Sequence, residues 1–313
     1  MLGKTAGGLF WMFRYLERAE NTARLVDAGL RIALTRSSSE EDEWASIVAT
    51  SGVRDAYLAR HKAFDAERVV DFLLRERENP SSVLCAMEGA RTNARMVRTA
   101  LTREVWEATN EGWMTIRDRL AEPPESRDLP RILDTIRHQT ALVRGVMHGT
   151  MLRNDIYDFA RIGTYLERAD NTARILDVKY YVLLPSAASV GSSLDNVQWE
   201  TILRCVSAQR AYHWLNQGDV NPQSIADFLI LDRRMPRSLA FCYDQVVDNL
   251  ARLAESYGTE YASLTVAQRT RKELKGQRIE AVFESGLHEF IERFVDQNNA
   301  LGLEIERDFR FYE

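Results

Sequence analysis

Two short segments of the chain carry the same charged and amide side chains in the same order. Residues 15–27 read YLERAENTARLVD and residues 165–177 read YLERADNTARILD, with ten of thirteen positions identical. Glutamate can transfer protons, arginine can hold a carboxylate or phosphate through paired N–H groups, and asparagine can both donate and accept hydrogen bonds. Residues of these types can line a site for an anionic ligand, and here the set occurs twice.

The two segments supply the candidate site residues. We predict Glu17 and Glu167 as catalytic acid/base residues. The predicted ligand-binding residues are, in the first copy, Arg18, Glu20, Asn21 and Arg24, and in the second copy, Arg168, Asp170, Asn171 and Arg174. With the helical period of about 3.6 residues, each copy places alanines and larger apolar residues on one face and these polar residues on the other.

The polar face needs an explanation because it matches between the copies as closely as the apolar face does. A solvated surface accounts for pairs such as Glu20 and Arg24, worth about 0.2–0.5 kcal/mol. It does not account for their repetition, because exposed positions tolerate substitution. Two explanations stay open. The helices pack across a pseudo-two-fold axis and bury a Glu-Arg-Asn network, or the side chains line a pocket, and a network can also frame a pocket.

The sequence gives weaker support to three other kinds of site. Four carboxylates, those of Glu17, Glu20, Glu167 and Asp170, could converge on a metal, but the Glu-x-x-His pattern of di-iron bundles is missing, so we predict no metal. Residues 154–158 (NDIYD) resemble one aspartate-rich helix of the isoprenoid synthases, a minor alternative, although a helix-capping role is simpler. No P-loop, GxGxxG or GxSxG motif occurs, so we predict no cofactor, and ATP would be used by another protein.

The elements that must position these residues are helices. Apolar residues recur every three or four positions between sparse prolines and glycines, and no stretch alternates with period two, which predicts an all-α fold. The predicted first-half helices and the second motif helix cover residues 9–36, 43–61, 66–77, 81–101, 104–120, 130–148 and 155–184.

The chain also repeats outside the motif helices. The motifs lie 150 residues apart, and Asp71-Phe72-Leu73 with Pro80 and Ser82 returns as Asp227-Phe228-Leu229 with Pro236 and Ser238. These matches predict an internally duplicated helical bundle with pseudo-two-fold symmetry, in which residues 1–150 and 151–313 are the two repeats, packed as one compact unit.

Composition narrows the class of protein. The 313 residues carry a net charge of −5, which argues against nucleic acid as a partner. No apolar stretch approaches the roughly 18–20 residues of a membrane span, and the first residues lack a secretory signal, so we expect a cytoplasmic protein without a membrane partner. Three arginines, Arg233, Arg234 and Arg237, are interpreted as solvated surface, with phosphate binding as the alternative. The three cysteines are interpreted as reduced core residues.

Several of these residues resemble the alpha-E domain family, a bacterial all-helical group. The likeness lies in Met1-Leu2 with Thr5-Ala6, in Phe10-Trp11 and in residues 14–24 (RYLERAENTAR), and it continues through residues 88–98 and 235–238. The resemblance implies a circularly permuted ATP-grasp protein as partner, often with a transglutaminase-like protein. The ten motif residues named above are the positions at which this sequence matches the motif of the family. The match by itself gives none of them a catalytic role.

The leading hypothesis combines the resemblance with the repeated motif. It is an accessory or catalytic component of ATP-grasp-associated peptide or amide ligation, with a Glu/Arg/Asn site built from the two motif helices. The alternative is a non-catalytic scaffold or interaction protein in which the repeated motif is a buried structural network.

Overall fold

The computed structural model describes residues 1–33, 39–182, 193–216 and 221–312. Over these residues it contains fifteen α-helices, one short 3-10 helix and no β-strand, which confirms the predicted all-α fold class. None of the helices within these ranges is both long enough and apolar enough to cross a membrane.

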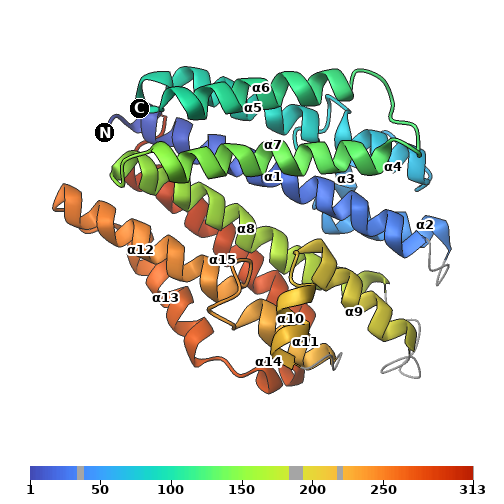
Figure 1. The fold of residues 1–313 in the computed structure, drawn as a ribbon. Coiled ribbons are helices and arrows are strands. Elements are labelled where there is room, and N and C mark those ends of the chain that lie inside the picture. The colour runs from blue at the N-terminus through green and yellow to red at the C-terminus, as the bar shows by residue number, and fades with distance from the viewer. Residues whose placement is uncertain (34–38, 183–192, 217–220, 313) are drawn as a thin grey trace.

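The helices follow one another along the chain with short connections (Figure 1). The first half contains α1 (Gly3–Ala33), α2 (Glu40–Thr50), α3 (Arg54–Leu58), α4 (Ala66–Leu74), α5 (Val83–Met96), η1 (Arg98–Ala100), α6 (Arg103–Arg119) and α7 (Leu129–Thr150). The second half contains α8 (Asp155–Val182), α9 (Ser193–Cys205), α10 (Gln209–Asn216), α11 (Pro222–Ile230), α12 (Leu239–Tyr257), α13 (Ala262–Gly276), α14 (Ile279–Ser285) and α15 (Leu287–Asp308).

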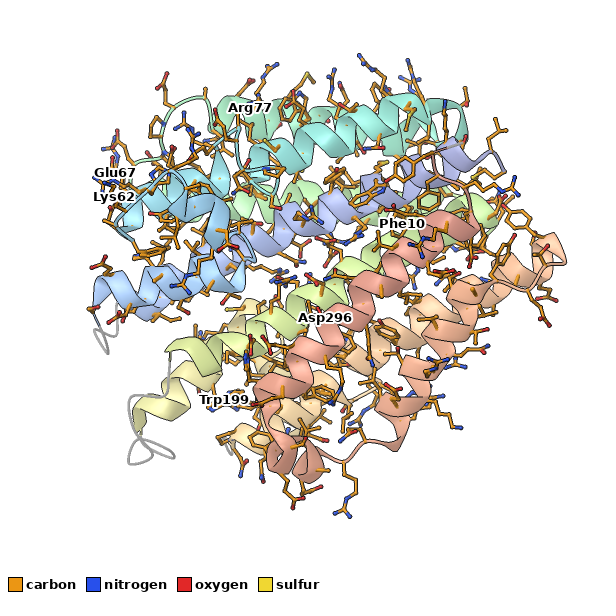
Figure 2. All side chains as sticks on the ribbon, turned by 180° about the vertical axis from the view of Figure 1, so that it is seen from behind. Phe10, Lys62, Glu67, Arg77, Trp199 and Asp296 are labelled. Carbon is orange, nitrogen blue, oxygen red and sulfur yellow. The ribbon has the colours of Figure 1, made fainter. Side chains whose placement is uncertain are left out.

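The two helices that carry the repeated segments, α1 and α8, pack against each other through the middle of the molecule (Figure 1). Helices α5 and α7 cover α1, whereas α12 and α15 cover α8. Figure 2 shows the opposite side, where α15 carries Asp296 and lies beside α8. This corresponding arrangement is what a duplicated chain would produce. The duplication itself and the division at residue 150 stay predictions.

Helix α1 is buried on both of its faces. Leu16 and Ala19 on the apolar face are 0% exposed, and Glu17 and Glu20 on the polar face are 0% and 1% exposed. These positions of the polar face are therefore not solvated surface, as the repetition of the motif indicates. Because an ionised carboxylate is costly to bury without a partner, each of these glutamates must be paired inside the protein.

A glycine brings α1 and α8 into backbone contact. A Cβ atom built on Gly163 of α8 would lie 2.3 Å from the carbonyl oxygen of Phe10 in α1. A contact under 3 Å of this kind cannot be relieved by a side-chain rotation, since the obstacle is backbone. The absence of a side chain at this position thus sets how closely the two motif helices approach.

A second glycine divides a helix that the sequence pattern joins. One helix was predicted over residues 43–61, but α2 ends at Thr50 and α3 begins at Arg54. Gly52 between them has φ +73°, a conformation that glycine adopts without steric cost and that ends a regular helix. A Cβ atom on Gly52 would lie 2.8 Å from Nη1 of Arg174, so the break also makes room for that guanidinium group.

Corresponding serines begin the helices that cover the motif helices. The Ser82 hydroxyl accepts from the backbone N–H of Cys85 at the start of α5, and the Ser238 hydroxyl accepts from the backbone N–H of Phe241 at the start of α12. Both are N-caps of the ordinary kind. The residues immediately before them, Ser81 and Arg237, consequently occupy corresponding places at the ends of their helices.

Candidate functional site

The carboxylate of Glu17 lies at the centre of a buried cluster of arginines. Arg168 of α8 donates from Nε to Oε1 at 2.8 Å and from Nη2 to Oε2 at 2.9 Å. Arg237, which precedes α12, donates to Oε1 at 2.9 Å, and Arg144 of α7 donates to Oε2 at 3.3 Å. Side chains from α7, from α8 and from the segment before α12 therefore converge on one side chain of α1.

Glu20 belongs to the same cluster. Its Oε1 accepts from Arg24 at 2.7 Å and from Arg237 at 2.7 Å, and its Oε2 accepts from Arg144 and from the hydroxyl of Thr140. We call Glu17, Glu20 and the four arginines, Arg24, Arg144, Arg168 and Arg237, the buried cluster. Because Arg237 was interpreted as solvated surface and is only 7% exposed, that interpretation is wrong for it.

The second motif helix forms the reciprocal ion pair. Glu167 of α8 accepts from Arg18 of α1, through Nε at 2.6 Å and Nη2 at 3.1 Å, just as Glu17 of α1 accepts from Arg168 of α8. Each copy thus pairs its glutamate with the arginine of the other copy. This reciprocity is the pattern of a contact across a two-fold axis. Glu167 also accepts from Arg14 at 2.8 Å.

The surrounding arginines keep these carboxylates ionised. Burial by itself would raise the pKa of Glu17, but Arg168, Arg237 and Arg144 outweigh burial and hold that pKa well below its ordinary value. Burial opposes Arg18 and Arg14 in the same way at Glu167, where the pKa falls to about 2. Proton transfer works best with a pKa near the working pH. The pairing therefore favours an electrostatic role for both glutamates, and their catalytic assignment stays a prediction.

We expect acid to unfold the protein through these carboxylates. The pKa values of Glu20 and Glu167 are lowered from 4.5 to about 2, in Glu20 because three arginines outweigh burial and the neighbouring Glu17. Their contribution to stability is complete above pH 4.5 and is lost as the pH falls toward 2, at about 1.4 kcal/mol per pH unit for each group. Urea unfolding at pH 6, 4.5 and 3 measures this slope. In a Glu167→Gln variant the free energy of unfolding should depend less steeply on pH. If the wild-type free energy of unfolding is unchanged from pH 4.5 to 3, the pairing is contradicted.

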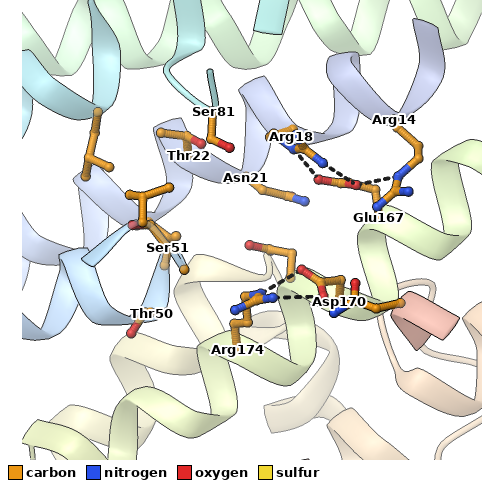
Figure 3. A pocket seen from close by; sticks show the side chains of 16 residues that line it. Arg14, Arg18, Asn21, Thr22, Thr50, Ser51, Ser81, Glu167, Asp170 and Arg174 are labelled. Carbon is orange, nitrogen blue, oxygen red and sulfur yellow. Dashed lines mark hydrogen bonds and ion pairs between the residues drawn. The ribbon is translucent and has the colours of Figure 1, made fainter. Parts of the chain in front are cut away.

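A polar pocket opens beside the reciprocal pair (Figure 3). It encloses about 180 Å³ between α1, α8, the α2–α3 connection, the start of α5 and α15. Six of the predicted residues line it: Arg18, Asn21, Glu167, Asp170, Asn171 and Arg174. The other four, Glu17, Glu20, Arg24 and Arg168, belong to the buried cluster. The structure therefore divides the predicted site into a closed part and an open part.

The pocket and the buried cluster also contain residues that were not among the ten predicted site residues. The pocket is also lined by Arg14, Thr22, Thr50, Ser51, Ser81 and Asn299. Arg144 and Arg237 belong to the buried cluster, and the hydroxyl of Thr140 donates to Glu20 of that cluster. The resemblance, which includes residues 235–238, pointed toward Arg237, as did its place in the arginine-rich segment 233–237. Arg144 lies in an ordinary amphipathic helix and carries no local signal.

Several hydrogen-bond donors of the pocket are unused. The side-chain amide nitrogens of Asn21 and Asn171 are buried and have no partner in the described part of the chain. Figure 3 shows the Asn21 nitrogen directed into the pocket, between the Arg18–Glu167 pair and Asp170. Arg18 donates through Nε and Nη2 to Glu167, and Arg174 donates through Nε and Nη2 to Asp170. Within the described residues neither arginine has an acceptor for Nη1, so four side chains of the pocket have unused donors.

The aspartate-rich segment at the start of α8 has other partners. Asp155 accepts from the hydroxyl of Tyr257 at 2.6 Å, and Asp158 accepts from Nε of Arg252 at 2.9 Å. In the ranges that the structure describes, no three His, Cys, Asp or Glu residues are grouped so as to hold a metal ion. Nothing in this part of the fold supports the isoprenoid-synthase alternative.

Comparisons with known proteins place the whole chain in one family. Over 270 residues it is 23% identical to an uncharacterised protein of Mycobacterium bovis and to uncharacterised proteins of two Mycobacterium tuberculosis strains. Each match covers 80% of this chain but 30% of the relative, so the chain spans about a third of the length of these curated relatives. No solved structure matches it. Residues 1–309 match the family Alpha-E, described as a predicted alpha-helical domain with a conserved ER motif, and the chain therefore belongs to that family.

Proposed function

We propose that the polar pocket binds a carboxylate-bearing molecule, and that the chain is an accessory or catalytic component of ATP-grasp-associated peptide or amide ligation. The observation that carries the proposal is the amide nitrogen of Asn21, which is buried, lacks an acceptor among the described residues and is directed into the pocket. A buried donor without a partner costs about 1–3 kcal/mol, and a bound acceptor would remove that cost.

The charges around this donor favour an anion. Arg14, Arg18 and Arg174 bring three positive charges to the pocket, against two negative charges from Glu167 and Asp170. Arg18 and Arg174 keep side-chain exposures of 24% and 31%, which leaves their free N–H groups accessible. A carboxylate can accept from a guanidinium group and an amide together.

The size of the pocket limits what it holds. A cavity of about 180 Å³ is slightly larger than one of about 150 Å³ that accepts benzene. It therefore has room for one carboxylate with a short side chain. A larger groove of about 680 Å³ adjoins it and shares Thr50, Gly52, Val53 and Arg174, so a longer molecule could extend outward.

The link to ligation comes from the family and from this chemistry together. Forming an amide joins a carboxylate to an amine, and a carboxylate is what the pocket is suited to bind. The expected partner, a circularly permuted ATP-grasp protein, would supply the use of ATP, and a transglutaminase-like protein is the second expected partner. In this proposal the chain presents or retains the carboxylate component for the ligase.

An Arg174→Gln variant tests the pocket. Hydrogen bonds to charged groups contribute about 1.5–3 kcal/mol, so affinity for a carboxylate should fall at least tenfold. Calorimetric titration with glutarate, acetate and inorganic phosphate measures this, first alone and then with the ATP-grasp protein, ATP and magnesium. Arg103→Gln is the matched control, because Arg103 lies on the surface with 83% side-chain exposure. If no probe saturates the wild-type chain, or if both variants bind equally, the proposal fails.

The buried cluster supports the scaffold alternative. Both oxygens of Glu17 and both oxygens of Glu20 are occupied by arginines of the chain itself, which is the arrangement of a structural network. In this alternative the ATP-grasp protein binds the Arg174→Gln variant as well as the wild type, and amide formation by the pair is unchanged. Loss of amide formation by a variant that is as stable as the wild type would favour the pocket.

A further inference from the structure

The pocket and part of the buried cluster are formed by equivalent positions of the two repeats. The part of the cluster around Glu17 and Glu20 uses the first motif, and the pocket uses the second. Ser82 and Ser238 are the equivalent N-caps of α5 and α12, so Ser81 and Arg237 correspond. Arg237 reaches from its position to Glu17 and Glu20 of the first motif, whereas Ser81 lines the pocket together with Glu167 and Asp170 of the second motif. One place is filled by a guanidinium group and the other is open.

The filled place shows what this arrangement of side chains binds. Nη1 of Arg237 donates to Glu17 at 2.9 Å and to the amide oxygen of Asn21 at 3.3 Å, and Nη2 donates to Glu20 at 2.7 Å. The motif counterparts of these three acceptors are Glu167, Asn171 and Asp170, and all three line the pocket. The chain thus contains one copy of a guanidinium site with its occupant built in, and a second copy without it.

Two further differences enlarge the open copy. Aspartate at position 170 is one methylene shorter than its counterpart Glu20. In the first half Arg144 of α7 donates to Glu17 and Glu20, whereas α15, which packs on α8 as α7 packs on α1, contributes Asn299 to the pocket. The pocket is therefore open because several of its side chains are smaller than their counterparts in the buried cluster, and not because of one shorter residue.

The pocket as a whole is positively charged and favours an anion, but compared with the buried cluster it lacks one guanidinium group. The buried cluster holds two carboxylates with four guanidinium groups, and the pocket holds two carboxylates with three. One added cationic group restores the ratio of the filled copy. If the same ligand also carries a carboxylate, that carboxylate offsets the charge of the added guanidinium group.

We infer that the ligand of the pocket carries a guanidinium group, seated against Glu167 and Asp170 as Arg237 is seated against Glu17 and Glu20. This inference rests on the proposed function for the second half of the ligand, its carboxylate. Arg174 lines both the pocket and the outer groove, and together with the unpaired amide nitrogen of Asn21 it can donate to the carboxylate. The ligand class is an arginine-like amino acid, or a short peptide that carries one.

Calorimetric titration of the full chain with four probes separates the two ideas. L-arginine has both groups, agmatine lacks the carboxylate, L-citrulline replaces the guanidinium group with a neutral urea of similar shape, and glutarate has carboxylates alone. We expect L-arginine to bind at least tenfold more tightly than L-citrulline and than agmatine. Equal binding of L-arginine and L-citrulline overturns the guanidinium inference and leaves the carboxylate proposal standing. Equal binding of L-arginine and agmatine overturns the carboxylate proposal and leaves the guanidinium inference standing. If no probe binds, both are overturned.

A Ser81→Arg variant tests the correspondence directly. Its side chain should enter the pocket as Arg237 enters the buried cluster, so affinity for L-arginine should fall at least tenfold while the melting temperature stays at or above that of the wild type. Ser81→Met is the matched control, because it adds similar length without charge and should not raise the melting temperature. If Ser81→Arg binds L-arginine as the wild type does, position 81 does not correspond to position 237. The titrations on wild-type protein decide the inference if this variant does not fold.

Discussion

Replacing Glu17 with alanine is expected to lower the free energy of unfolding by about 3–5 kcal/mol, the usual cost of removing one partner from a buried ion pair. The change leaves Arg168 and Arg237 without their shared acceptor, and their side chains are only 10% and 8% exposed. The pKa of Arg237 is already lowered to about 10, because burial is only partly offset by Glu17. Chemical denaturation monitored by circular dichroism measures the loss.

The matched variant is Glu167→Ala, which removes the corresponding carboxylate from the other motif. Its partners Arg14 and Arg18 keep side-chain exposures of 12% and 24%, and Arg18 lines the pocket. They can be solvated once the carboxylate is gone, so we expect a clearly smaller loss than for Glu17→Ala. Equal losses for the two variants would show that the open and closed parts of the site are energetically alike, contrary to the asymmetry described above.

Replacing Gly163 with alanine is the second substitution with a large expected effect. The added methyl group would meet the Phe10 carbonyl oxygen at 2.3 Å, and that oxygen belongs to a helix backbone that cannot move aside alone. Helices α1 and α8 would have to separate, which strains the packed core between them. Overpacking of this kind usually costs about 1–3 kcal/mol, and contact with backbone puts this site at the upper end.

The control for this substitution is Gly145→Ala in α7. A Cβ atom there meets nothing within 4 Å, so only helix propensity changes, and the variant should be stabilised by up to about 1 kcal/mol. Urea denaturation of both variants gives opposite shifts of the midpoint. A Gly163→Ala protein as stable as the wild type would mean that α1 and α8 lie farther apart than described.

Much of the local structure follows from residues that are neighbours in the chain. Three- and four-residue spacing of apolar side chains predicted α6 and α7 to within two residues, because helical hydrogen bonds and side-chain faces depend on positions at most one turn apart. The same reasoning joined α2 to α3. Apolar spacing contains no sign that Gly52 adopts a positive φ and ends α2.

The candidate site could be predicted only in part. Repetition of Glu17 and Arg18 as Glu167 and Arg168 indicated that the polar faces are constrained, and the structure shows them paired across the two motif helices. Their division into a closed cluster and an open pocket could not be predicted. Arg144 and Arg237 lie far from Glu17 in sequence and reach it only through the packing of α7 and α12.

The spacing of apolar residues establishes that the chain is helical, and direct repetition establishes that it carries the polar motif twice. The contact of Arg237 with the first copy, and the pocket lined by Ser81 beside the second copy, become visible in the folded chain alone. The physical reason is that the environment of a buried charge is set by side chains from helices remote in the chain. Nearly identical motifs therefore acquire different surroundings when those helices carry a large cation on one side and a small hydroxyl on the other.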